Sequence, residues 1–156
     1  MKRRRLAALA VGALAPLAAL GSAAATSPAV TPVVHVAGAD LDDLVQVNAD
    51  NVKFQTKVPT DVSVVTLTLD PNATTGWHSH PGLAVIAVAE GTGKLYSADC
   101  SARTYSAGEA FVEDGDDTPT VFRNESASSV VLTVTFIAPQ GSPLLHGEAD
   151  PGCGLS

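Results

Sequence analysis

The sequence has 156 residues, of which 46% are hydrophobic, and a formal net charge of −7 at pH 7. This length suits one domain with its own core. The acidic balance repels phosphate backbones and anionic lipids, which argues against nucleic acids and membrane surfaces as partners.

Residues 1–25 have the pattern of a secretory signal peptide. A basic head, Lys2–Arg5, precedes an apolar run from Leu6 to Leu20, and the small residues Ala23 and Ala25 suit a cleavage site. The run of about 15 residues is short for a transmembrane helix, although a retained membrane anchor is the alternative. Cleavage after Ala25 would leave five basic and sixteen acidic residues, a net charge of −11. We therefore expect a protein that is secreted or periplasmic and free of the membrane after cleavage.

Beyond the signal peptide, the pattern is that of short strands. Residues 26–42 are rich in Ala, Thr, Pro and Asp and predict a loose N-terminal segment. Asp61–Leu69 and Ser129–Ile137 alternate with period two, and Leu83–Ala89 is a continuous apolar run of strand length. Further strand candidates are Leu44–Val47, Val52–Lys57, Lys94–Ala98, Glu109–Glu113 and Thr120–Arg123. No helical period runs for more than about ten residues, so residues 43–140 predict an all-β sandwich or small barrel.

Two cysteines, Cys100 and Cys153, lie in the second half of the chain. Export would place them in an oxidising compartment, where an even count predicts a disulfide. The bridge would attach the C-terminal tail, residues 141–156, to the body of the domain. Two free thiols or an intermolecular bridge are the alternatives.

The segment from Gly76 to Gly82 carries the clearest chemical signal. His78 and His80 are two residues apart, so on an extended strand they point to the same face with Cβ atoms about 7 Å apart. Two imidazoles at that separation can bind one borderline divalent metal ion. The flanking glycines and Pro81 predict that this strand ends at a barrel rim.

This segment resembles the first motif of the cupin superfamily, which has a Gly, a His-x-His pair and a later Gly that falls here on Gly91. Gly108, a relaxed Pro-x-Gly at Glu113–Gly115 and Asn124 resemble the second motif. The resemblance runs from about Val62 to Pro139. It implies a single jelly-roll cupin barrel, often paired as a homodimer, which composition alone would not separate from an immunoglobulin-like sandwich.

The sequence departs from the cupin pattern at two ligand positions. The family's Glu falls on Ala84, and its third His falls on Thr120. We expect Glu113 to supply the missing carboxylate, which with His78 and His80 would give the two-His-one-carboxylate set of non-haem iron oxygenases. In the alternative, Glu113 belongs to a solvated acidic turn, and the histidines line a pocket that binds an organic ligand or no ligand at all.

The expected metal is Fe, Mn, Zn or Ni. The side chains expected to line a small-molecule pocket are Trp77, Ala84, Thr120 and Phe122. His35 and His146 lie in poorly patterned segments and are expected to be exposed to solvent. Three functions stay open: a metal-dependent cupin acting as a dioxygenase or isomerase, a metal-free module for a small molecule or carbohydrate, and a non-catalytic structural cupin.

Overall fold

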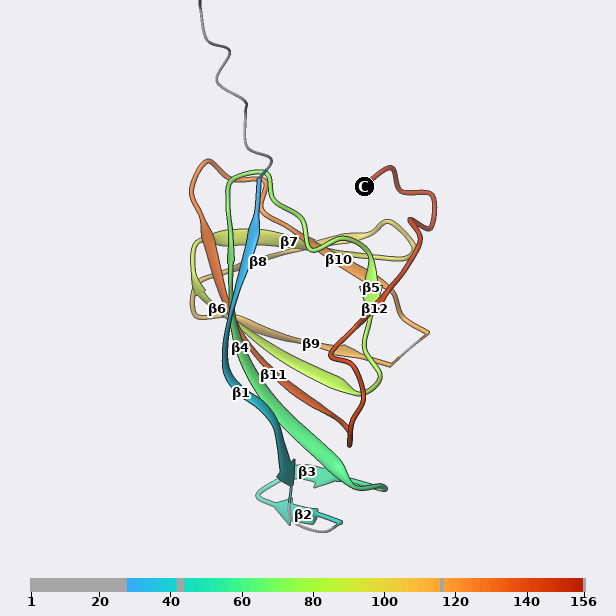
Figure 1. The fold of residues 1–156 in the computed structure, drawn as a ribbon. Coiled ribbons are helices and arrows are strands. Elements are labelled where there is room, and N and C mark those ends of the chain that lie inside the picture. Colours follow the sequence, from blue (N-terminus) through green and yellow to red (C-terminus); the bar gives the residue numbers. More distant parts are fainter. Residues whose placement is uncertain (1–27, 42–43, 116, 156) are drawn as a thin grey trace, which may run out of the picture.

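The chain folds into two five-stranded antiparallel sheets that face each other around a common interior (Figure 1). The computed structural model describes residues 28–41, 44–115 and 117–155. The first sheet has the order β1 (Val30–Leu41), β4 (Thr60–Leu69), β11 (Val130–Pro139), β6 (Leu83–Glu90) and β9 (Ala110–Asp114). The second has the order β12 (His146–Gly147), β5 (His78–Ser79), β10 (Thr120–Arg123), β7 (Thr92–Ser97) and β8 (Ala102–Ser106). A separate hairpin joins β2 (Gln46–Ala49) to β3 (Val52–Gln55).

The core lies between the two sheets and follows the period-two pattern of the sequence. Alternate residues of β11 are buried, and they face the same way because successive side chains of a strand point to opposite sides. The second sheet contributes Phe122, whose ring stacks on that of Phe111 with centroids 5.8 Å apart. These contacts close the barrel, and they confirm the predicted all-β jelly-roll.

The N-terminal region differs from the prediction. In place of a loose segment at residues 26–42, the structure has the twelve-residue strand β1, paired antiparallel with β4. The strand lies at the sheet edge and is exposed along most of its length. It also carries Pro32 and Gly38, which edge strands tolerate and which weakened the strand signal. Strands β8 and β12 were not expected either.

The C-terminal tail is fixed to the second sheet in two ways. The predicted disulfide between Cys100 and Cys153 is present and joins the tail to the turn that connects β7 and β8. Strand β12 pairs with β5, so that Gly147 lies opposite His78. The tail therefore lies directly against the segment that carries the histidine pair.

The predicted signal peptide lies outside the described residues. Within the part of the chain that the structure describes, no helix has the length and hydropathy needed to cross a membrane.

Candidate metal centre

His78, His80 and Glu113 meet in the interior of the barrel. The histidines come from β5 and the residue that follows it, and the glutamate comes from β9 of the other sheet. The Nε2 atoms of His80 and His78 lie 3.1 Å and 3.7 Å from Glu113 Oε2. All three residues are buried, with 4 to 8% of their surface exposed. The structure thus brings together the three residues that the sequence suggested as metal ligands.

The backbone around the pair explains why glycines flank it. Gly76 adopts φ of +71°, a left-handed conformation that side chains other than glycine rarely adopt. At Gly82 a Cβ atom would lie 2.3 Å from the carbonyl oxygen of Ile137, so only glycine lets this segment approach β11 so closely. These two positions fix where the histidine segment enters and leaves the rim.

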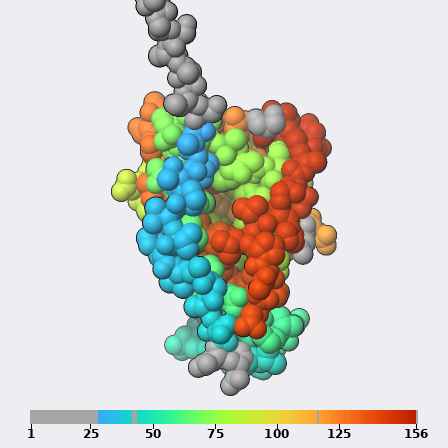
Figure 2. Space-filling model, in the orientation of Figure 1, coloured from blue at the N-terminus to red at the C-terminus, as the bar shows by residue number. Residues whose placement is uncertain are grey.

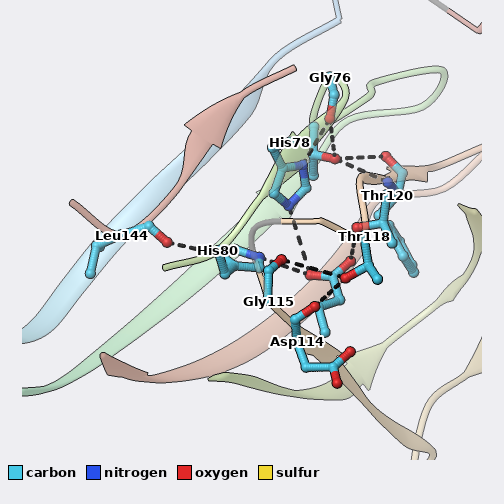
Figure 3. Close-up of polar contacts among 11 residues, drawn as sticks. Gly76, His78, His80, Asp114, Gly115, Thr118, Thr120 and Leu144 are labelled. Carbon is cyan, nitrogen blue, oxygen red and sulfur yellow. Dashed lines mark hydrogen bonds and ion pairs between the residues drawn. The ribbon is translucent and has the colours of Figure 1, made fainter. Parts of the chain in front are cut away.

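Backbone carbonyls set the orientation of both imidazoles (Figure 3). His78 Nδ1 lies 2.9 Å from the carbonyl oxygen of Gly76, and His80 Nδ1 lies 2.8 Å from that of Leu144 in the C-terminal tail. A carbonyl oxygen only accepts hydrogen bonds, so each Nδ1 carries a proton. In the neutral form, each Nε2 then presents a lone pair toward Glu113. Such outer contacts orient metal-ligating histidines in proteins generally.

The carboxylate of Glu113 is held from behind by Thr120. The Thr120 hydroxyl donates a hydrogen bond of 2.7 Å to Oε1, which leaves Oε2 facing the histidines. Burial raises the pKa of Glu113, but hydrogen bonds with His78, His80 and Thr120 and the charge of His78 outweigh burial and lower this pKa to about 2. Burial likewise lowers the pKa of His78, and its interactions with Glu113 outweigh that effect and raise it. Glu113 is therefore ionised at neutral pH.

The two altered family positions lie beside the centre. Ala84 is the cross-strand partner of Glu113 in the β6–β9 pair. Directly opposite residues of antiparallel strands place their Cβ atoms about 4.5–5.5 Å apart on one face, so Glu113 reaches the region that a glutamate at position 84 would reach. Thr120 is the partner of His78 in the β10–β5 pair, and it contacts the carboxylate instead of supplying an imidazole.

The cluster forms part of the wall of a cavity of about 430 Å³. Most of its wall is aliphatic and aromatic and comes from both sheets, including the rings of Phe111, Phe122 and Phe136. Alternate residues of β1 and the tail residues Leu144 and Leu145 also line it. Figure 2 shows β1 and the C-terminal segment on either side of a hollow on this face of the molecule.

The predicted pocket residues occupy different places. Phe122 lines the cavity, whereas Thr120 lies behind the carboxylate of Glu113. Ala84 is fully buried, and Trp77 is 6% exposed; neither is part of the cavity wall. The indole N–H of Trp77 is buried without a hydrogen-bond partner among the described residues. A role for these four residues in binding a ligand stays a prediction.

Sequence reasoning missed the contributions of β1 and the tail. The disulfide was a sign that the tail returns to the body, but no sequence pattern marks a backbone carbonyl such as that of Leu144 as the partner of a histidine. His35 and His146 are exposed, as expected. His35 lies on the outer strand β1, where its Nε2 is 2.8 Å from the hydroxyl of Thr66.

The fold and the buried cluster define a class: small antiparallel barrels with two histidines and a carboxylate converging in an interior cavity. The cupin domain family matches residues 65–136, which cover the central strands and all three clustered residues. Residues 65–136 therefore carry a cupin domain. A search of curated proteins found no match.

Solved structures with a similar fold include cupin proteins. A cupin 2 conserved barrel domain protein from Leptotrichia buccalis is 15% identical with a TM-score of 0.51, and the match covers 70% of this chain and 41% of that one. A structure of DMSP lyases is 12% identical with a TM-score of 0.50, covering 56% of this chain and 44% of that one. A sugar phosphate isomerase of the cupin superfamily from Silicibacter pomeroyi is 21% identical with a TM-score of 0.43, covering 47% and 48%. This chain spans less than half the length of each, and the two similarities with TM-scores of 0.50 and 0.51 show the fold alone.

Proposed function

We propose that this protein is an exported cupin that binds one divalent metal ion through Nε2 of His78, Nε2 of His80 and Oε2 of Glu113, and presents it to a small molecule in the cavity. The expected ions are Fe, Mn, Zn and Ni, since imidazole and carboxylate suit all of them. Export would place the disulfide in the oxidising environment where such bridges persist.

One observation carries the proposal. With both histidines neutral, two imidazole lone pairs face one ionised carboxylate oxygen in a buried site, because the Nδ1 protons of His78 and His80 are committed to backbone carbonyls. Three hydrogen-bond acceptors repel one another unless a positive charge lies between them. A metal ion supplies this charge, and a proton that makes one histidine an imidazolium is the alternative.

The spacing of the donor atoms fits a metal ion. The potential ligand atoms of the three residues lie within 4.8 Å of one another, and the two Nε2–Oε2 distances are 3.1 and 3.7 Å. Ligands held at about 2.0–2.2 Å from one ion lie roughly 3.0–3.5 Å apart. Small movements of the rings would complete the site, and positions for further ligands would face the cavity.

In this site, each protein group has a separate task. The carbonyls of Gly76 and Leu144 hold the imidazoles, and the Thr120 hydroxyl holds Glu113. The apolar wall lowers the local polarity around the buried donor atoms, which strengthens electrostatic interactions at the centre. A bound ion would act as a Lewis acid and polarise an oxygen of the ligand, the chemistry required of an oxygenase or isomerase.

Metal titration of the full exported protein after chelation tests the proposal. We expect one equivalent of Zn²⁺ or Mn²⁺ to bind to the wild type and none to a His78→Ala/His80→Ala variant. His35→Ala is the matched control, because it removes an exposed imidazole outside the cluster. Equal metal content in the wild type and the double variant would overturn the proposal.

A metal-free binding module is the second candidate. The raised pKa of His78 favours an imidazolium that pairs with Glu113 and closes the site without an ion. The apolar cavity would then bind its ligand alone. This candidate predicts that ligands raise the melting temperature equally in chelated and metal-loaded protein.

A further inference from the structure

The wall of the cavity restricts the kind of molecule that can bind beside the metal. Among the described residues that line it, His78, His80 and Glu113 are the ionisable ones, and none is a lysine or arginine. The remaining polar side chains of the wall are those of Thr74 and Thr75, and the hydroxyl of Thr75 already lies within hydrogen-bond distance of backbone atoms of Gly76 and Phe122. Few hydrogen-bond partners are therefore left for a ligand away from the metal.

The charge balance limits the ligand further. A divalent ion with two neutral imidazoles and one carboxylate carries a net charge of one positive unit. One anionic oxygen group would make the buried centre neutral, whereas a second negative charge would have no cation in the described wall to pair with. A phosphate or a dicarboxylate would therefore be buried with excess charge.

Hydroxyl groups on a ligand would also be unfavourable in this cavity, because the wall offers them few hydrogen-bond partners. A hydroxyl group buried against aliphatic and aromatic walls loses its hydrogen bonds to water, at a cost of about 1–3 kcal/mol for each group. Apolar atoms gain from the same surroundings, at roughly 25 cal/mol for each Å² buried. The volume of about 430 Å³ lies within the range of roughly 300–1,000 Å³ in which pockets bind small organic molecules.

From these observations we infer that the ligand of this site is a small apolar molecule with one anionic oxygen group, such as a carboxylate, enolate or phenolate, that binds the metal while its hydrocarbon part fills the cavity. The inference rests on the proposed metal site and adds the class of ligand. It excludes sugars, sugar phosphates and dicarboxylates from the site.

Two matched pairs of probes test the inference in Co²⁺-loaded protein. 1-Cyclohexene-1-carboxylate and shikimate share one carbon skeleton and one carboxylate, and shikimate adds three hydroxyls. Hexanoate and adipate differ by a second carboxylate. We expect the apolar monoanion of each pair to bind at least about tenfold more tightly in calorimetry. It should also change the visible spectrum of the bound Co²⁺.

Neighbouring residues of β1 provide matched variants that should fold normally. Val34 lines the cavity and Val33 does not, and both are exposed, at 56% and 52%. Val34→Asp places a negative charge at the cavity and should weaken cyclohexenecarboxylate binding by about tenfold, because apolar contact is lost and like charges repel. Val33→Asp should leave the affinity unchanged.

The outcomes separate this inference from the proposed function. If Co²⁺ does not bind, the metal site itself is refuted. If Co²⁺ binds and shikimate or adipate binds as tightly as its apolar partner, the metal site stands and the ligand class is wrong. Equal effects of Val34→Asp and Val33→Asp would show that ligands do not enter this cavity.

Discussion

The cavity wall has a polar part, the polar end, formed by His78, His80 and Glu113, and an apolar remainder, the apolar end, and the two are built in different ways. At the polar end, three side chains from separate segments converge, and each is held by one specific partner: Gly76, Leu144 or Thr120. At the apolar end, many aliphatic side chains share the wall, and no single contact determines its shape. One substitution should therefore abolish metal binding, whereas one substitution in the wall should only adjust ligand affinity.

The largest effect is expected from releasing the C-terminal tail, which orients His80 and also lines the cavity. Replacing Cys100 and Cys153 with serine removes a cross-link between residues 53 positions apart. The loop-entropy model assigns such a bridge about 4 kcal/mol of stability, which urea denaturation would measure. Metal affinity should fall as well, because the tail supplies the carbonyl that orients His80. Unchanged metal affinity in the folded variant would show that the tail stays in place without the bridge.

The next largest effect is expected at the carboxylate. Glu113→Gln keeps the size of the side chain and removes the charge that would attract the proposed ion. Because loss of outer contacts alone typically costs 10–100-fold in metal affinity, loss of this ligand should cost more than about a hundredfold. Competition with a chromophoric chelator measures the change. Glu90→Gln, at an exposed position, is the control and should bind metal normally.

The metal-free protein should show a pH dependence that originates at the polar end. The pKa of Glu113 is lowered from 4.5 to about 2, so its contribution to stability is present above pH 4.5 and is lost as the pH falls toward 2. The pKa of His78 is raised above 6.5, so its contribution is present below pH 6.5 and is lost as the pH rises through the raised value. Chelated protein should therefore be most stable between about pH 4.5 and 6.5.

Urea midpoints measured across pH would test this window. Glu113→Gln removes the charge on which both shifts depend, so its profile should be flatter than that of the wild type. Parallel profiles for the two proteins would mean that these groups do not interact in the folded state.

The smallest effect is expected at the apolar end. Leu144→Ala removes a side chain that lines the cavity but retains the backbone carbonyl that orients His80. Metal affinity should stay at the wild-type value, and the affinity for an apolar ligand should fall by a few fold, since the leucine is already 36% exposed. A loss of metal affinity in this variant would show that the two ends are not separable.

Much of this arrangement could be predicted from the sequence. Period-two alternation identified the central strands, and the resemblance to cupins identified the barrel and directed attention to Glu113. The edge strand β1 was missed because Pro32 and Gly38 interrupt it and because apolar residues such as Val33 also lie on its outer face. The wall residues Val30, Pro32 and Val34 were missed for the same reason. The contact between His80 and the carbonyl of Leu144 could not be predicted, because every residue has a backbone carbonyl and residue type does not show which one will be the partner.

The pairing of Ala84 with Glu113 has a consequence for how metal sites are recognised in sequences. A linear motif assigns each donor to a fixed place along the chain, but the ion responds only to where the oxygen lies in space. Two strands in register offer two chain positions for the same oxygen, so a donor can be exchanged between them while the coordination set is retained. A cupin whose motif lacks a ligand should therefore be inspected at the cross-strand partner of the altered motif position.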